Sequence, residues 1–441
     1  MKLSKYTHII RKGTCSIIYN CHTEAVSAVE NKLADFLNDG NIESIASIHP
    51  EFYDFLRESE FIVPTDEIEY EKVIERWKKE EESPTYSVFV NPTLDCNLNC
   101  WYCYEEHRKG SIMDQKTIDS VIAHVNNIVE VRKIKELSLS FFGGEPLIML
   151  HKVILPLIKE VQQICIKNNV QLHVGFVTNG TLLTPGNIEL LLNLNLSTGC
   201  SFQITFDGNK VYHDRTKKFA NGNGSYDLIL CNLRNALSAQ FNVVIRLNMT
   251  ADNIDSYYDL LSDLKKIPIE SKKCAQIDFQ HIWQDGGRIR PEELLKRQTE
   301  LRDAFIAAGF DVKELKNIDP YRCYADRCNH VTVNYNGDLY KCTARDFKKE
   351  EREGILNEDG TLSWNEKREL REKLKFGNNA CLKCRIYPLC HGGCSQYKID
   401  MKESDVCIRQ RSEEDIDAVI EQRVDYLLES LINIKKNGKT K

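Results

Sequence analysis

Residues 95–104, DCNLNCWYCY, place three cysteines in one short stretch, at Cys96, Cys100 and Cys103. A structural zinc site needs four ligands and a disulfide needs two, so a group of three is unusual. Aspartate and asparagine residues between the cysteines make the stretch polar, which disfavours a role in core packing. Three thiolates at this spacing can hold three corners of a cubane iron–sulfur cluster and leave one iron open. Zinc with a distant fourth ligand, such as His107, is the alternative.

The composition favours a metal-binding protein of a reducing compartment. The chain has 441 residues, 17 of them cysteine, and a net charge of −6. The first residues lack the apolar core of a signal peptide, and no apolar run reaches the roughly 18 residues of a membrane span, so we expect a cytoplasmic protein. The charge balance predicts no affinity for nucleic acid or membranes. In such a compartment, dense cysteines are more often metal ligands than disulfides.

Alternating strands and helices from Thr85 onward predict an α/β fold built on a parallel sheet or a partial barrel. Parallel strands direct their carboxyl ends to one edge, where sites of such folds lie. Five polar or glycine positions follow predicted strands and are expected to meet at that mouth, namely Cys96, Gly143, Asn179, Asp207 and Asn248.

The alternation stops on both sides of this core, which predicts three domains with the boundaries 1–84, 85–310 and 311–441. The first domain is expected to contain two strands around the Lys12-Gly13 turn, a helix over 23–40 and further short helices. The last domain is rich in cysteine and glycine. It is expected to contain a hairpin over 330–342 with an Asn336-Gly337 turn and a closing amphipathic helix over 412–434.

A second signature lies one strand–helix unit after the cysteines, in FFGGEP at residues 141–146. Together with Tyr102 before the last cysteine of the loop, it resembles the radical S-adenosylmethionine (SAM) superfamily. The resemblance implies a partial (β/α)6 barrel and a [4Fe-4S] cluster whose open iron binds the methionine end of SAM. It also implies that one electron from the cluster cleaves SAM to a 5′-deoxyadenosyl radical, which takes hydrogen from the substrate.

The same resemblance implies which residues contact SAM. The turn Gly143, Gly144, Glu145, Pro146 can approach the methionine ammonium group, because glycine allows close approach of the backbone and carbonyl or carboxylate oxygens accept hydrogen bonds. Tyr102 is expected near the adenine. The cation for the SAM carboxylate is expected to be Arg215 or Arg246, and Lys217 stands where related enzymes often carry arginine. The remaining candidates for cofactor contacts are Asn179, Thr205 and Asp207.

Eight further cysteines lie between Cys323 and Cys407, and the run at 381–394 resembles the SPASM domain, which holds auxiliary [4Fe-4S] clusters. The resemblance implies two such clusters. Two zinc sites would need the same eight thiolates, so spacing alone leaves both metals open. The first implied set is Cys323, Cys328, Cys342 and Cys394, and the second is Cys381, Cys384, Cys390 and Cys407.

SPASM enzymes mostly modify peptides or proteins. Residues 1–84 resemble the winged-helix-like leader-recognition (RRE-like) domain of ribosomal peptide maturases, which binds a leader as an added strand. We therefore expect a precursor peptide as substrate, abstraction of a Cα or Cβ hydrogen, and a thioether, C–C or C–O cross-link. A flavodoxin- or ferredoxin-type protein is the expected electron donor.

The alternative is oxidation of a protein Cys or Ser to formylglycine, as in anaerobic sulfatase maturases. Those enzymes carry a basic aspartate directly after the hairpin cysteine. Here Thr343 follows Cys342, and Asp346, the candidate catalytic acid or base, comes three residues later. A metal-binding adaptor with structural zinc is a rival of another class, and the intact GGEP turn disfavours it.

Overall fold

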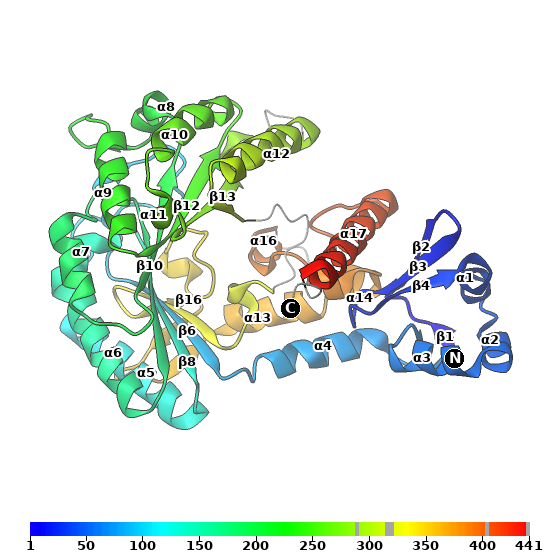
Figure 1. The fold of residues 1–441 in the computed structure, drawn as a ribbon. Coiled ribbons are helices and arrows are strands. Elements are labelled where there is room, and N and C mark those ends of the chain that lie inside the picture. The colour runs from blue at the N-terminus through cyan, green and yellow to red at the C-terminus, as the bar shows by residue number, and fades with distance from the viewer. Residues whose placement is uncertain (287–290, 314–321, 402–404, 438–441) are drawn as a thin grey trace. The chain divides into compact units, whose positions relative to one another are not determined.

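The computed structural model describes residues 1–286, 291–313, 322–401 and 405–437, and they form two compact units (Figure 1). The smaller unit contains the described residues of Met1–Glu82, Lys316–Arg327 and Glu369–Lys441. The larger unit contains those of Ser83–Leu315 and Cys328–Arg368. The expected three-domain division stays a prediction. None of the described helices is long and apolar enough to cross a membrane.

The larger unit is built on one mixed sheet of 11 strands in the order β14-β13-β12-β10-β9-β8-β6-β15-β16-β17-β18. All neighbours from β14 to β15 are parallel, and the last three pairs are antiparallel. The first six parallel strands in chain order form the expected α/β core. They are β6 (Thr85–Asn91), β8 (Glu136–Phe141), β9 (Gln171–Thr178), β10 (Cys200–Phe206), β12 (Asn242–Met249) and β13 (Ala275–His281); the others are β14 (Asp311–Val312), β15 (His330–Asn334), β16 (Asp338–Tyr340), β17 (Gly354–Leu356) and β18 (Leu362–Trp364).

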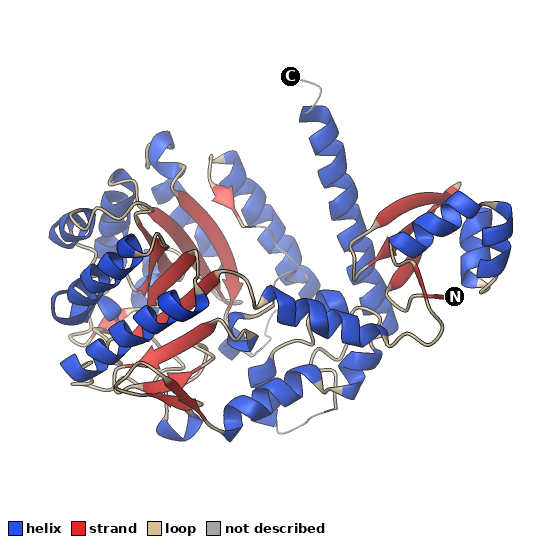
Figure 2. Ribbon diagram, turned by 90° about the horizontal axis from the view of Figure 1, so that it is seen from below, coloured by secondary structure: helices blue, strands red, loops and turns tan. Residues whose placement is uncertain are grey.

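Helices cover one face of this sheet, and alternation along the strands decides which side chains they bury (Figures 1 and 2). Phe141, Phe176 and Phe202 stack across three neighbouring strands, with ring centroids 5.3 and 5.0 Å apart. The intervening residues, such as Gln203 and Thr205, are only half-buried on the other face. The covering helices are α5 (Gln115–Arg132), α6 (Leu155–Lys167), α7 (Pro185–Leu192) and α9 (Tyr226–Ser238).

Local signals in the sequence match this unit closely. Asp114 caps α5, because its carboxylate accepts a hydrogen bond from the backbone N–H of Thr117 at 2.8 Å. The predicted hairpin is β15 and β16, and Gly337 in its turn has a φ of 80°, a conformation that favours glycine.

The smaller unit begins with a three-stranded antiparallel sheet, and one prediction for it is wrong. The strand pair around Lys12-Gly13 is confirmed, but residues 26–30 form a third strand where we expected a helix. Val26 and Val29 favour a strand once backbone pairing with its neighbour is available, and short apolar runs do not separate the two states. The elements are β2 (Thr7–Lys12), β3 (Cys15–Asn20), β4 (Val26–Glu30), α1 (Asn31–Asn38), α2 (Ile42–Ile48), α3 (Pro50–Glu58) and α4 (Glu69–Glu80), with β1 (Lys2–Leu3) paired to β5 (Ile62–Val63).

One hydrophobic core joins this N-terminal sheet to the cysteine-rich C-terminal region. Tyr19 of the sheet, Trp77 of α4, Tyr387 of the cysteine region and Val424 of the last helix, α17 (Glu413–Asn437), belong to the same buried cluster. The rings of Trp77 and Tyr387 meet edge to face, with centroids 4.9 Å apart. The two ends of the chain therefore fold around a common core within this unit.

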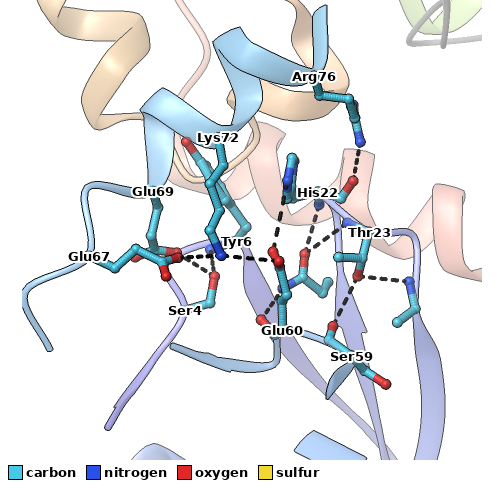
Figure 3. A network of polar contacts seen from close by, with 12 residues as sticks. Ser4, Tyr6, His22, Thr23, Ser59, Glu60, Glu67, Glu69, Lys72 and Arg76 are labelled. Carbon is cyan, nitrogen blue, oxygen red and sulfur yellow. Dashed lines mark hydrogen bonds and ion pairs between the residues drawn. The ribbon is translucent and has the colours of Figure 1, made fainter. Parts of the chain in front are cut away.

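Polar contacts connect α4 and the residues just before it to the segments that precede β2 and β5 (Figure 3). The Lys72 ammonium lies 3.1 Å from a carboxylate oxygen of Glu60 and 3.0 Å from one of Glu67. The buried Glu69 carboxylate accepts hydrogen bonds from the Ser4 hydroxyl and, at 3.1 Å, from the Lys5 backbone N–H. Because Glu69 is buried, losing these donors would leave a costly unsatisfied carboxylate.

The shared core predicts that Trp77→Ala destabilises the smaller unit strongly. Removal of a fully buried tryptophan costs about 3–5 kcal/mol, and urea unfolding followed by circular dichroism measures it. The control is Trp283→Ala, since that side chain is 64% exposed and its removal costs less than about 1 kcal/mol. Equal losses from the two variants would contradict the shared core.

Candidate active site

The cysteine loop that follows β6 is held on two sides. The backbone N–H of Glu145 donates to the Asp95 carbonyl at 2.8 Å, and that of Gly144 donates to the Thr93 carbonyl at 3.3 Å. On the other side, β7 (Leu98–Asn99) pairs antiparallel with β11 (Lys218–Phe219). The loop is therefore clamped between the GGEP turn and β11.

Two glycines make this clamp possible. A Cβ atom on Gly143 would lie 2.3 Å from the Thr93 carbonyl oxygen, and one on Gly144 would lie 2.3 Å from that of Asp95. Gly143 also has a φ of 105°. The close approach that the sequence suggested is thus an approach to the cysteine loop, while an approach of this turn to SAM stays a prediction.

Glu145 ties the ends of two strands together from a fully buried position. Its carboxylate accepts hydrogen bonds from the Thr178 hydroxyl and the Asn179 backbone N–H, both at 2.7 Å, and from the Leu147 backbone N–H at 3.0 Å. Burial raises the pKa of this carboxyl, and the three donors oppose the rise. Pro146 begins the short 3-10 helix that follows, Pro146–Met149. Glu145 therefore positions the turn, and its direct contact with SAM stays a prediction.

Residues after β9 hold the first cysteine. The Asn179 side-chain amide donates to the Asn97 side-chain oxygen at 2.8 Å and lies 3.8 Å from the Cys96 sulfur. The Asn97 amide in turn donates to the Thr181 hydroxyl at 2.8 Å. These contacts bring the ends of β6 and β9 together, as expected from the positions of Cys96 and Asn179.

A second group surrounds Tyr102 and Cys100. The Tyr102 hydroxyl donates to an Asp207 carboxylate oxygen at 3.2 Å and accepts from the Asn248 amide at 3.1 Å. The buried Lys217 ammonium lies 3.8 Å from the same Asp207 oxygen and 3.9 Å from the Cys100 sulfur. The other Asp207 oxygen is buried and has no hydrogen-bond partner among the described residues. One acceptor is therefore left for a ligand.

The three cations near the mouth differ in their surroundings. Arg246 of β12 is in register with Thr205 of β10, and its Nε donates to the Asn248 side-chain oxygen at 2.9 Å. Arg215 of α8 (Lys210–Thr216) lies over the ring of Tyr212. Within the described residues, Lys217 alone of the three contacts a loop cysteine, whereas the cations expected from the sequence were the two arginines. The sequence signal for Lys217 was its position four residues after His213, where related enzymes often carry arginine.

A cavity of about 420 Å³ opens beside this group. Its lining comes from the cysteine loop, from α8 and from the segments at the ends of β10, β12 and β13. It therefore lies at the carboxyl ends of the parallel strands, where sites of such folds occur. Its lining residues include Trp101, Asp207, Arg215, Thr250 and Ile282.

Asp346 borders the cysteine loop from the segment after β16. Its carboxylate accepts a hydrogen bond from the Glu106 backbone N–H at 3.1 Å and forms an ion pair with Lys348 at 3.5 Å. Burial, together with the nearby Asp346 charge, raises the pKa of the Glu105 carboxyl to about 8. Nothing in the sequence marks Glu105 as buried, so this second carboxyl was missed.

The loop thiols fit an iron–sulfur cluster. Burial raises the pKa of Cys96 to about 12 and of Cys103 to about 11, so these thiols become thiolates only with a strong cationic partner such as iron. The described residues contain no group of three His, Cys, Asp or Glu side chains arranged for a single ion. A cubane places each thiolate ligand on a separate iron, so three neighbouring thiolates can hold it and leave one iron open.

The C-terminal cysteines fall into two groups. In the smaller unit, Cys381 and Cys384 interact electrostatically with Cys390 and Cys407, and Cys323 interacts with Cys394. Cys328 and Cys342 belong to the larger unit. The second implied ligand set therefore lies within one unit, whereas the first is divided between the units. All eight ligand roles stay predictions.

The clamp on the cysteine loop predicts the effect of Gly144→Ala. The new methyl group would meet backbone, which cannot move aside cheaply, so the free energy of unfolding falls by about 1–3 kcal/mol. The control is Gly186→Ala in α7, where the methyl group meets nothing within 4 Å and helix propensity favours alanine. Urea denaturation measures both, and a loss in Gly144→Ala no larger than in the control would refute the clamp.

Comparisons with known proteins agree with this geometry. Residues 90–264 match the model of the radical SAM superfamily. The cysteine-type anaerobic sulfatase-maturating enzyme of Clostridium novyi is 24% identical over 346 residues, which cover 71% of this chain and 88% of that protein. The radical SAM cyclopropyl synthase TigE of Paramaledivibacter caminithermalis is 25% identical over 444 residues, 89% of each chain.

Among solved structures, Streptococcus suis SuiB bound to precursor peptide SuiA is similar with a TM-score of 0.51 and 15% identity, covering 92% of this chain and 97% of that one. The segment that matches the superfamily contains the cysteine loop, the GGEP turn and the Tyr102–Asp207–Lys217 group. Members of this superfamily use SAM and a [4Fe-4S] cluster. Residues 90–264 are therefore a radical SAM domain.

Proposed function

We propose that this enzyme matures a ribosomally made precursor peptide by installing a thioether, C–C or C–O cross-link. The observation that carries the proposal is the common core of the N-terminal sheet and the cysteine-rich region in a radical SAM enzyme. Such a core links a candidate peptide-binding sheet to candidate auxiliary cluster ligands in one folded unit. The similarity to SuiB, whose structure contains a precursor peptide, supports it.

In the proposed site, Cys96, Cys100 and Cys103 hold the cluster. When bound, the cluster and SAM supply a 5′-deoxyadenosyl radical that removes a hydrogen atom from the substrate, after a flavodoxin- or ferredoxin-type donor supplies the electron. Asp207, with its free buried oxygen, and the GGEP turn bind SAM. Lys217 is the cation best placed to bind the SAM carboxylate near the cluster, since it already contacts Asp207 and Cys100.

The face of the large sheet that points away from the covering helices suits a peptide. Ser140, Gln203 and Thr205 face away from the helices and are half-buried, and Arg246 adds a cation at the same level. A peptide backbone carries one donor and one acceptor per residue, which must find partners when it leaves water. Polar side chains along the strands provide such partners, and they can bind the backbone of peptides with different sequences.

We place the leader of the peptide at an edge of the β2-β3-β4 sheet. In this order β2 and β4 each pair with β3 alone, so each has one edge without a strand partner in the sheet. Side chains of β2 face the C-terminal region, since His8 contacts the Arg385 carbonyl at 3.2 Å and Lys12 pairs with Asp425 at 3.4 Å. Both outer strands, β2 and β4, are therefore candidates for strand addition.

The second candidate function is formylglycine formation on a protein Cys or Ser. The similarity to the sulfatase-maturating enzyme favours it. Thr343 after Cys342 counts against it, because the expected base is displaced to Asp346. The product distinguishes the two functions, since only formylglycine is an aldehyde.

The direct experiment is anaerobic co-expression with candidate short peptides from open reading frames near the gene, followed by mass spectrometry of each peptide. Each cross-link removes two hydrogen atoms from the peptide, and Cys96→Ala abolishes the change. A hydrazide reagent labels an aldehyde but not a cross-link, so labelling would support formylglycine instead. An unmodified peptide in the presence of active enzyme would reject this peptide as substrate.

Asp346→Asn tests the proposed acid–base role. We expect product formation to fall by about 10²–10⁴-fold, the usual contribution of a positioned acid or base, while SAM cleavage to 5′-deoxyadenosine continues. The control is Asp359→Asn, which changes an exposed carboxylate that caps a turn through Thr361. A parallel loss of SAM cleavage would instead assign Asp346 to support of the cysteine loop.

A further inference from the structure

A lysine lies buried against one of the C-terminal cysteines. Lys398 of α16 (Ser395–Met401) is fully buried, and its ammonium lies 3.6 Å from the Cys381 sulfur and 3.2 Å from the Leu374 carbonyl oxygen. The ammonium therefore has one neutral acceptor and one sulfur as its partners.

The surroundings of Lys398 lack a compensating carboxylate. Among the described residues, no Asp or Glu forms an ion pair with it. Lys375, the other buried lysine of this region, differs, because its ammonium lies 2.6 Å from a buried Asp326 carboxylate oxygen. An unpaired buried charge is expensive, and the cost is avoided only if negative charge is present nearby. For Lys398, the candidate source of that charge is the thiolate group at Cys381.

Cys381, the cysteine beside Lys398, would supply that charge as a metal-bound thiolate. Cys381 interacts with Cys390 and Cys407, and the same two interact with Cys384. Cys381, Cys384 and Cys390 pack against the common hydrophobic core, which excludes water from one side. Low dielectric on that side strengthens the attraction between the ammonium and anionic sulfur.

We propose that Lys398 raises the reduction potential of the second auxiliary cluster by a charged hydrogen bond to the Cys381 sulfur. The inference rests on the proposed function, which places a [4Fe-4S] cluster on Cys381, Cys384, Cys390 and Cys407. Reduction adds one electron, and no proton, to a site that already carries net negative charge. A fixed cation stabilises the reduced state more than the oxidised state, and hydrogen bonds to cluster sulfurs act in the same direction.

This makes Lys398 a positioning residue that favours electron acceptance. Closing the cross-link from the substrate radical forms one C–S, C–C or C–O bond and breaks one S–H, C–H or O–H bond, which releases one proton and one electron. The proposed base Asp346 takes the proton, and the electron needs an acceptor. The second auxiliary cluster takes it more readily with Lys398 present, and passes from its oxidised to its reduced state.

The experiment uses the full chain with Cys96→Ala, Cys100→Ala and Cys103→Ala, so that only auxiliary clusters contribute. Three changes at Lys398 separate charge from hydrogen bonding: Lys398→Gln keeps a donor without charge, Lys398→Met removes both, and Lys398→Arg keeps both. Lys383→Gln is the matched control, because Lys383 lies between Cys381 and Cys384 in the sequence but is exposed, where solvent screens its charge. Iron is counted per chain, and potentials are measured by redox titration with electron paramagnetic resonance.

We expect Lys398→Gln and Lys398→Met to lower one of the two auxiliary potentials. The shift corresponds to at least a tenfold loss of reduced cluster at a given applied potential, or about 59 mV for one electron. Lys398→Arg and Lys383→Gln keep the parent potential. Loss of iron from Lys398→Gln but not from Lys398→Arg would also support a need for positive charge.

Two outcomes overturn the inference. One is an unchanged potential in Lys398→Gln with full iron content. The other is loss of iron from both Lys398→Gln and Lys398→Arg, which would assign Lys398 a packing role alone. A parent protein with fewer than about eight irons per chain would instead show that the auxiliary sites of the proposed function are absent or incomplete, and would remove the basis of the inference.

Discussion

The buried carboxylate of Glu145 is the contact on which the site depends. The backbone N–H of Glu145 donates to the Asp95 carbonyl in the cysteine loop. The two carboxylate oxygens of Glu145 accept hydrogen bonds from Thr178 and Asn179 at the end of β9. One residue thus connects three segments that carry the site. Because the carboxylate is buried, each donor it loses leaves an unsatisfied charged group, so the arrangement resists distortion. The glycines before it are needed because their neighbours lie too close for any side chain.

The smaller unit shows how distant parts of a chain can depend on each other for folding. The N-terminal sheet shares one buried cluster with α4 and α17. It completes that core with Tyr387, Leu389 and Val424 from the C-terminal region. The Lys5 ammonium also donates to the Leu382 carbonyl at 2.6 Å, beside Cys381 and Cys384. Changes in the sheet therefore reach the cysteine region directly.

Much of the larger unit was predictable, because its signals are local. Strand–helix alternation located the ends of β6, β8, β9 and β10, and the cap at Asp114 and the hairpin turn at Gly337 follow from residue type. The prediction of a helix over 23–40 was wrong in its first half, where β4 forms instead. Backbone pairing of β4 with β3 outweighed the short apolar pattern that suggested a helix. Strand pairing is a long-range property, and a single sequence reports it poorly.

The candidate site was predictable in its motifs and less so in its electrostatics. Of the residues expected to meet at strand ends, Asn179 lies beside Cys96, and Asp207 and Asn248 both contact Tyr102. Lys217, Glu105 and Lys398 take their importance from burial beside residues far away in the chain. Composition and spacing do not encode burial of a single charged side chain, so these residues became visible only in the folded structure.

We infer that the three-cysteine loop holds a cluster whose open iron binds SAM. Anaerobic reconstitution with iron counted per chain, followed by reduction in the presence of SAM, tests it most directly. We predict about twelve irons, four for each of three clusters, and release of 5′-deoxyadenosine by the wild-type chain but not by Cys96→Ala. Bound zinc in place of iron, with no 5′-deoxyadenosine from the wild-type chain, would contradict the claim.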